Sequence, residues 1–216
     1  MTLVLLAAAC GERPPAAADA DRTPADSTDA RPVIVFLGTS LTAGLGLDPS
    51  QAYPALIQQK LDSAGLDYRV VNAGVSGETS SDARARIAWL LRMNPAVLVV
   101  ETGANDGLRG LGVDALRANL DSILTIAARH QPPPRLVVIG MQAPPNLGQR
   151  YTSAFGAVFP EEAGRHDAAL VPFLLQGVGG VDSLNQGDGI HPTAAGQQVL
   201  AETVWEVLER TLSAGR

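Results

Sequence analysis

A serine near one end of the chain and an aspartate–histidine pair near the other carry the side chains of a nucleophilic hydrolase. Ser40 lies in Gly-Thr-Ser-Leu, directly after an apolar run, and Asp188 and His191 lie in Asp-Gly-Ile-His-Pro. A serine hydroxyl becomes a useful nucleophile when a base removes its proton, and a carboxylate orients that base. The pattern therefore predicts acyl transfer, with Ser40 as nucleophile, His191 as base and Asp188 as the orienting carboxylate.

The spacing of Asp188 and His191 separates this histidine from the other two. One tight turn between them lets the carboxylate hydrogen-bond the imidazole and fix its tautomer. His130 ends a helical pattern beside three prolines, at the end of the helix where the dipole favours a histidine. His166 lies in a polar stretch, where we expect it to be solvated.

Acyl transfer also needs hydrogen-bond donors directed at the oxyanion of the tetrahedral intermediate. The first candidate is the backbone N–H of Ser40, if Ser40 opens a helix. Gly74 offers an N–H that no side chain obstructs, and Asn105 offers a side-chain amide. Taken alone, Gly74 is more simply interpreted as a turn glycine and Asn105 as the residue of an Asx-turn.

Short apolar segments alternate with amphipathic ones along the chain. Strands are predicted at 33–37, 68–72, 97–101, 136–139 and 170–171, and helices at 53–61, 80–91, 114–130 and 193–212. Uniformly apolar strands indicate burial on both faces, as in a parallel sheet. The alternation predicts a doubly wound α/β domain.

The candidate side chains follow successive strands of this predicted sheet. Ser40 comes after the first strand, Gly74 after the second and Asn105 after the third. Because chemistry in such folds lies beyond the carboxyl ends of the strands, we expect these residues to meet at one sheet edge.

The loops at this edge are mostly apolar, which suits an acyl chain or an aryl group better than a sugar. The predicted substrate-pocket residues are Leu45, Leu47, Leu108, Arg109, Pro145 and Ile190. Arg109 is interpreted as a solvated side chain, and contact with an anionic head group is the alternative.

Composition excludes several other classes of function. The net charge of the 216 residues is −6, and no basic stripe interleaved with aromatic residues appears, so nucleic acid is not an expected partner. The single cysteine excludes a disulfide or a cysteine-based metal site within this sequence. The glycine-rich segment 38–46 lacks the lysine of a phosphate-binding loop. We predict no metal and no cofactor.

The N-terminal residues have the pattern of a targeting segment. Residues 1–10 form a short apolar run that ends at Cys10, as in a signal peptide or a lipobox. Residues 11–32 are poor in large apolar side chains and are predicted to be a disordered linker, and the domain is predicted at 33–216. We therefore expect an exported protein, periplasmic or lipid-anchored through Cys10 in a bacterial envelope. An uncleaved terminus with an incidental cysteine is the alternative.

Four short blocks, in order along the chain, resemble those of the SGNH (GDSL-type) hydrolases. They are Gly38-Thr39-Ser40-Leu41, Gly74, Gly103-Ala104-Asn105-Asp106 and Asp188-Gly189-Ile190-His191-Pro192. Further segments resemble the bacterial thioesterase I, lysophospholipase and arylesterase branch: 44–47, 53–56, 103–110, 140–141, 144–146, 171–173 and Trp205.

The resemblance implies a flavodoxin-like three-layer α/β/α domain with a five-stranded parallel sheet. It also implies hydrolysis of small acyl or aryl esters, lysophospholipids or acyl thioesters through an acyl-enzyme on Ser40. The oxyanion hole would comprise Ser40, Gly74 and Asn105. The chain departs from the family at Thr39, where the usual residue is Asp.

Two other hypotheses remain open from the sequence. One is a carbohydrate O-acetyl esterase in the same fold. The other is a non-catalytic, ligand-binding surface lipoprotein, although such a protein has no need of a base beside a hydroxyl.

Overall fold

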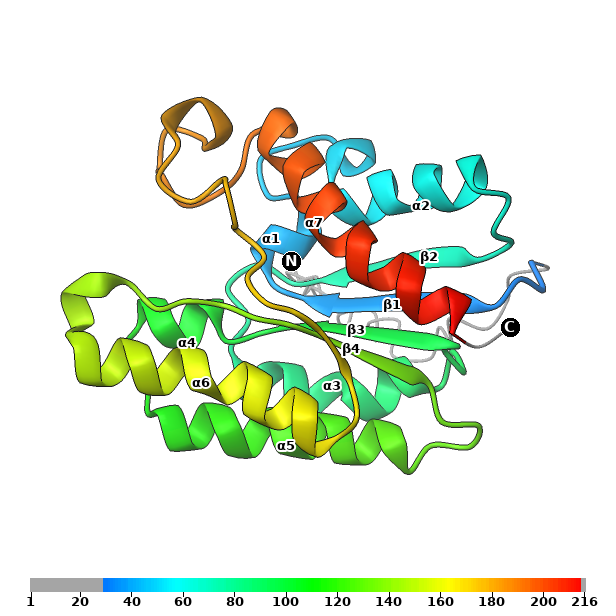
Figure 1. The fold of residues 1–216 in the computed structure, drawn as a ribbon, viewed down its shortest axis with the longest axis horizontal. Helices are drawn as coiled ribbons and strands as arrows, with labels where there is room; N and C mark the ends of the chain where they lie inside the picture. The colour runs from blue at the N-terminus through cyan, green and yellow to red at the C-terminus, as the bar shows by residue number, and fades with distance from the viewer. Residues whose placement is uncertain (1–28, 215–216) are drawn as a thin grey trace, which may run out of the picture.

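A five-stranded parallel sheet forms the centre of the molecule in the computed structural model, which describes residues 29–214 (Figure 1). The strands are β1 Val33–Gly38, β2 Arg69–Gly74, β3 Val97–Glu101, β4 Arg135–Ile139 and β5 Ala169–Val171. Their order in the sheet is β2-β1-β3-β4-β5, which is the flavodoxin-like order. The predicted α/β fold with five parallel strands is confirmed.

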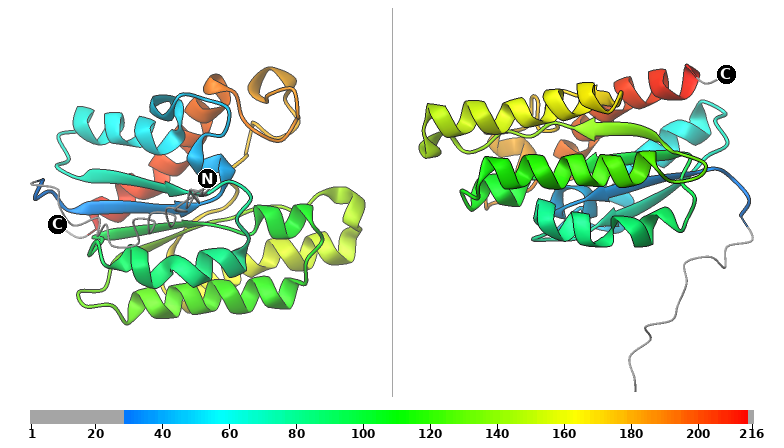
Figure 2. Two further views of the ribbon diagram at one scale, coloured as in Figure 1. Left: turned by 180° about the vertical axis from the view of Figure 1, so that it is seen from behind. Right: turned by 90° about the horizontal axis from the view of Figure 1, so that it is seen from below.

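Helices cover both faces of the sheet. The longer helices are α2 Tyr53–Ser63, α3 Ser80–Leu91, α5 Val113–Ala128, α6 Gln149–Arg165 and α7 Ala194–Ser213. Helices α2 and α7 pack together on one face, and α3, α5 and α6 cover the other (Figure 2). Two short helices, α1 Ser40–Ala43 and α4 Ala104–Leu108, lie at the carboxyl edge of the sheet. The result is the expected three-layer architecture.

Strand β1 occupies a central place and is buried along its whole length, as its uninterrupted apolar sequence predicts. It pairs with β2 from Val33↔Arg69 to Gly38↔Gly74 and with β3 on its other side. This register brings the ends of the first three strands to one edge, so the residues that follow them lie close together.

The amphipathic patterns match the buried helix faces. Helix α5 buries Leu116, Leu120, Ile123, Leu124 and Ala127, at the spacing of one helical face. Helix α3 begins with a capping box between Thr79 and Asp82, and Thr193 caps α7.

Helix α6 has no counterpart among the helices predicted from the sequence. Gly156, Pro160 and Gly164 lie within it and obscure its helical pattern. Tertiary packing overrides these weak local preferences, because Phe155 and Phe159 are buried in the hydrophobic core and pack edge to face.

The segment 1–10, with Cys10, lies outside the described residues, as does nearly all of the predicted linker 11–32. The last linker residues are described, and they are ordered against β2. Arg31 donates a hydrogen bond to the carbonyl of Tyr68, and the Arg69 N–H donates to the carbonyl of Pro32. Within residues 29–214, no helix is both long enough and apolar enough to cross a bilayer.

Candidate active site

The sharp turn between β1 and α1 presents Ser40 at the edge of the sheet. Thr39 caps the helix, and its side chain accepts a hydrogen bond from the Leu41 N–H. Gly38 is required by close approach, since a Cβ at this position would lie 2.9 Å from Oε2 of Glu101 and still nearer to Thr42. The turn therefore packs directly onto the residues behind it.

Ser40, His191 and Asp188 form a continuous hydrogen-bonded relay. The Oγ of Ser40 lies 2.9 Å from Nε2 of His191, and Nδ1 of His191 lies 2.7 Å from Oδ2 of Asp188. The other Asp188 oxygen accepts the N–H groups of His191 and Ile190. These donors hold the pKa of Asp188 well below its usual range, with the His191 backbone N–H as the largest cause. The carboxylate therefore stays ionised and holds the proton of His191 on Nδ1.

The loop that carries His191 is tied to the loop that follows Ser40. The side-chain amide of Gln186 donates to the carbonyls of Leu45 and Pro192, and its backbone N–H donates to the His191 carbonyl. These bonds fix His191 relative to Ser40 across a long separation in sequence.

Two of the three candidate oxyanion donors line the same cavity. Ser40 is the first residue of α1, so its N–H has no acceptor within the helix. Asn105 lies in the first turn of α4 and donates one amide hydrogen to the carbonyl of Glu78, which leaves the second amide hydrogen for a substrate. Both residues line the cavity beside His191.

Gly74 takes a different position from that expected of a free donor. Its N–H donates to Oδ1 of Asn72 at 2.9 Å, and Gly74 does not line the cavity. A Cβ on Gly74 would lie 2.8 Å from the Cα of Ala43 and 2.9 Å from the Thr39 carbonyl oxygen. The structure thus requires glycine here for close packing against α1, and Asn72 must release the N–H before it can reach an oxyanion.

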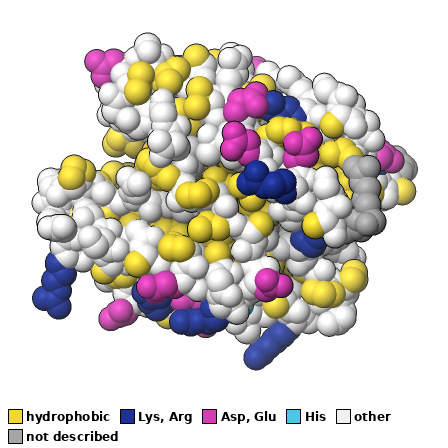
Figure 3. Space-filling model, viewed as in Figure 1, with side chains coloured by type: hydrophobic (Ala, Val, Ile, Leu, Met, Phe, Trp, Pro, Cys, Tyr) yellow, Lys and Arg dark blue, Asp and Glu magenta, His cyan; other side chains and the backbone are white. Residues whose placement is uncertain are grey.

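A cavity of about 300 Å³ opens beside the relay and is lined mainly by apolar side chains. The apolar side chains in its wall include Leu41, Leu108, Met141, Phe173, Leu175 and Ile190. Figure 3 shows apolar side chains in the hollow between the loop that leads to α7 and the ends of α4 and α6. The cavity can accept an acyl chain or an aryl ring next to the Ser40 hydroxyl.

The predicted pocket residues divide between this cavity and other surfaces. Leu108 and Ile190 line it, but Leu45, Leu47, Arg109 and Pro145 do not. Leu45 is exposed, Pro145 lines a separate hollow, and Arg109 donates to the carbonyl of Gly77.

The loops after β4 and β5 supply cavity-lining residues that were not predicted from the sequence, namely Met141, Phe173 and Leu175. In the sequence, the segments 140–141 and 171–173 indicate only the resemblance to the family. Their positions after two of the predicted strands were the signal that could have placed them in the pocket.

Two buried carboxyl groups near the site receive no role from the sequence analysis. Asp106 accepts hydrogen bonds from the backbone and the hydroxyl of Ser80, and so fixes α4 to the start of α3. Glu101, at the end of β3, accepts hydrogen bonds from Thr39 and Thr42 on either side of Ser40. A signal was available for Glu101, since it is the one charged residue in the apolar run 97–101.

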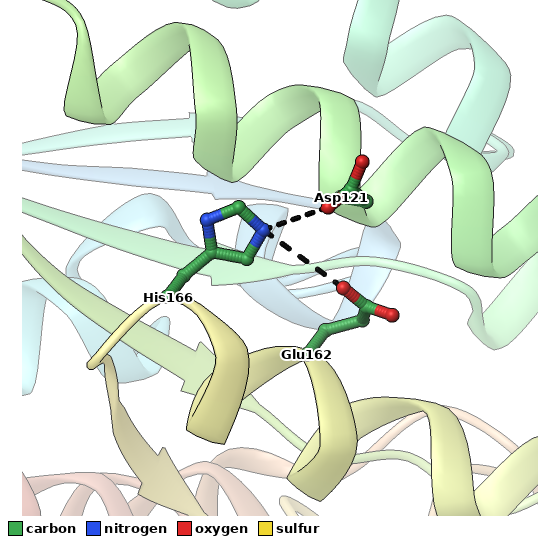
Figure 4. A group of neighbouring side chains, drawn as sticks. All are labelled: Asp121, Glu162 and His166. Carbon is green, nitrogen blue, oxygen red and sulfur yellow. Dashed lines mark hydrogen bonds and ion pairs between the residues drawn. The ribbon is translucent and has the colours of Figure 1, made fainter.

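Asp121, Glu162 and His166 form the one group of potential metal ligands within residues 29–214 (Figure 4). His166 Nε2 lies 2.9 Å from Asp121 and 3.9 Å from Glu162. Arg165 contacts both carboxylates, and Arg117 contacts Glu162. Because arginines already supply positive charge here, we interpret the group as an ion-pair network that joins α5 and α6. The prediction of a solvated His166 is wrong, since its side chain is 12% exposed.

Comparisons with known proteins agree on the family. The profile of the GDSL-like Lipase/Acylhydrolase family matches residues 36–199. The chain is 46% identical to Esterase TesA of Pseudomonas aeruginosa over 180 residues, which cover 83% of this chain and 89% of that protein. It is 37% identical over 177 residues to thioesterase 1/protease 1/lysophospholipase L1 of Escherichia coli K12, covering 82% and 83% of the two chains. The crystal structure of TesA superposes with a TM-score of 0.79 and 45% identity, over 84% of this chain and 99% of that chain.

Proposed function

Because the chain belongs to the GDSL-like lipase and acylhydrolase family, we propose that it hydrolyses small acyl or aryl esters and thioesters through an acyl-enzyme on Ser40. One observation carries the proposal. The hydrogen-bonded relay from Ser40 through His191 to Asp188 opens directly into an apolar cavity.

The reaction follows from the atoms of the relay. Nε2 of His191 accepts the proton of Ser40 as Oγ attacks the acyl carbon, and Asp188 stabilises the imidazolium that forms. The Ser40 N–H and the Asn105 amide donate to the oxyanion. His191 then protonates the departing alcohol or thiol, and an acyl group remains on Ser40. Water, deprotonated by His191, attacks this ester, and His191 returns that proton to the Ser40 oxygen as the carboxylic acid departs.

The cavity narrows the class of substrate. Its volume of about 300 Å³ lies at the small end of ligand pockets and suits a short or medium acyl chain or one aromatic ring. Hydroxyl groups of a sugar would find mostly apolar side chains there, which would leave those hydroxyls without partners. Acyl and aryl esters are therefore the favoured substrates over acetylated carbohydrates.

A substrate panel tests this function. We expect turnover of p-nitrophenyl esters and acyl thioesters, with kcat/KM rising to an optimum chain length and then falling as the cavity fills. Acetylated sugars serve as the comparison. Faster hydrolysis of acetylated sugars than of any acyl or aryl ester would contradict the assignment, and so would full ester turnover by Ser40→Ala.

We also propose export of this enzyme and lipidation at Cys10, on the basis of the sequence pattern of residues 1–10. Growth with radiolabelled palmitate should label the full chain in the envelope fraction, and Cys10→Ser should remove the label. An unlabelled chain in the envelope would support export and contradict lipidation at Cys10, whereas a cytoplasmic chain would contradict both proposals.

A further inference from the structure

Glu101 is a buried acid that lies directly behind the turn carrying Ser40. It ends β3 and is 1% exposed. Its Oε2 accepts the Thr39 N–H at 2.7 Å and the Thr42 hydroxyl at 2.9 Å, and the Thr39 hydroxyl lies 3.0 and 3.1 Å from the two oxygens. One carboxyl group thus binds the residue before Ser40 and the residue two positions after it.

Such an anchor matters because α1 is very short. A helix of four residues has little stability of its own, so tertiary contacts must fix the direction of Ser40. Thr39 and Thr42 are both buried, and neither forms part of the relay. Glu101 hydrogen-bonds to both of them, while His191 contacts the Ser40 hydroxyl.

The surroundings of Glu101 provide donors but no direct cation. The Thr42 hydroxyl also meets the hydroxyl of Tyr53 on α2 at 2.8 Å. The charged group that acts on Glu101 is Glu78, before α3, and Glu78 pairs with Arg86 on α3. Among the ion pairs within residues 29–214, none includes Glu101. Burial raises the pKa of Glu101, and the donors from Thr39 and Thr42 oppose that rise.

We propose that Glu101 is a positioning residue for the nucleophile and that Thr39 is its matched partner. A threonine hydroxyl can donate to the Glu101 carboxylate, so a single acid anchors the turn without sharing a proton. This inference rests on the proposed role of Ser40. It also explains how the chain accommodates threonine where the family usually has aspartate.

If Thr39 and Glu101 are a matched pair, an acidic residue in place of Thr39 should conflict with the Glu101 carboxyl group. In Thr39→Asp, a second carboxyl group would stand about 3 Å from Glu101 in a buried site, where two such groups cannot both ionise. The pair must then hold a shared proton or move apart, and the second outcome shifts α1. Glu101→Gln keeps an oxygen for the Thr39 N–H and removes the conflict, because its amide can donate to the new carboxylate.

The test is a double-mutant cycle of Thr39→Asp and Glu101→Gln, with Thr39→Asn as the neutral control of similar size. Values of kcat and KM for one p-nitrophenyl ester, relative to wild type, are measured from pH 6 to pH 9. Melting temperatures are measured over the same range. Ratios to wild type cancel any pH dependence that all the variants share.

We expect Glu101→Gln to lower kcat by about 3-fold and Thr39→Asp by about 10-fold at pH 8, with KM nearly unchanged, because misplaced catalytic groups lose rate. The loss in Thr39→Asp should grow as pH rises, and its melting temperature should fall more steeply with pH than that of wild type. Adding Glu101→Gln to Thr39→Asp should recover about 3-fold of activity or more, a reversal of sign that independent losses cannot give.

Two losses that simply add, or a Thr39→Asp profile parallel to that of wild type at every pH, would overturn the proposal. If Thr39→Asp does not fold, recovery of a folded protein in the double variant supports it. Failure of the double variant, or of Thr39→Asn, overturns it, because bulk rather than charge is then responsible. The melting data do not depend on catalysis, so they separate this inference from failure of Ser40 as nucleophile.

Discussion

Replacing Gly74 with alanine tests how tightly the turn that carries Ser40 is packed. The added Cβ would lie 2.8 Å from the Cα of Ala43, 2.9 Å from the carbonyl oxygen of Thr39, and nearer still to the Ala43 nitrogen. Ordinary contacts begin near 3.4 Å, and all three atoms belong to the backbone. The clash is therefore relieved only if α1 moves away from β2.

The required shift is about 1 Å, a displacement that can lower the rate by about 100-fold when it misplaces a catalytic group. That factor corresponds to about 2.7 kcal/mol of transition-state stabilisation. Overpacking should also destabilise the fold by about 1–3 kcal/mol. We expect a lower kcat with KM changed little, because most of the cavity wall comes from other loops.

Gly156→Ala is the matched control, since a Cβ there would have open space in helix α6. The assay combines ester-hydrolysis kinetics with urea unfolding of both variants. Wild-type kcat in Gly74→Ala would refute the reasoning, because it would show that α1 tolerates displacement. An equal loss in Gly156→Ala would refute it as well, since the loss would then not depend on the site.

Three further outcomes follow from the site. Asp188→Asn should lower kcat by about 100-fold, less than His191→Ala, because the carboxylate is partly exposed and water can replace some of its support; an equal or greater loss, measured by steady-state kinetics, contradicts this. Met141→Trp should fill part of the cavity and shift the acyl-length optimum to shorter chains, and an unchanged optimum would place the acyl chain elsewhere. Burial raises the pKa of Glu101, so the folded protein holds the proton of this acid more tightly than the unfolded chain does. The resulting stability is complete below the unfolded pKa and is lost as pH rises through the folded pKa. The melting temperature of Glu101→Gln should therefore increase relative to that of wild type as pH rises, and a parallel pH dependence of the two proteins would exclude this titration.

Most of the strands and longer helices, and the pairing of Asp188 with His191, were accessible from the sequence because their signals are local. Apolar runs such as 33–37 and 97–101 carry the mark of buried strands, and the sheet rule then places Ser40 and Asn105 at one edge. The short spacing of Asp188 and His191 predicts the tight turn that joins them.

Other features depend on contacts between distant segments, which local patterns do not encode. Helix α6 forms despite an internal proline, because Phe155 and Phe159 are buried in the hydrophobic core. The partner of Thr39 is Glu101, which lies in another strand. His166 is predicted as solvated when only its neighbours in sequence are considered, yet Asp121 of another helix binds it.

The pocket shows the same division. Residues beside the relay, such as Ile190, are predicted from the sequence because Ile190 adjoins His191 in the chain. Met141 and Phe173 are not, since their part in the cavity depends on how far the loops after β4 and β5 extend across the site.

The central claim is that Ser40 attacks the acyl carbon with His191 as its base. Intact-mass analysis followed by peptide mapping of the protein treated with a fluorophosphonate ester measures this most directly. We predict one adduct per chain, located on Ser40, with no adduct in Ser40→Ala and greatly slowed labelling in His191→Ala. An adduct on another residue, or unchanged labelling in Ser40→Ala, would contradict the account.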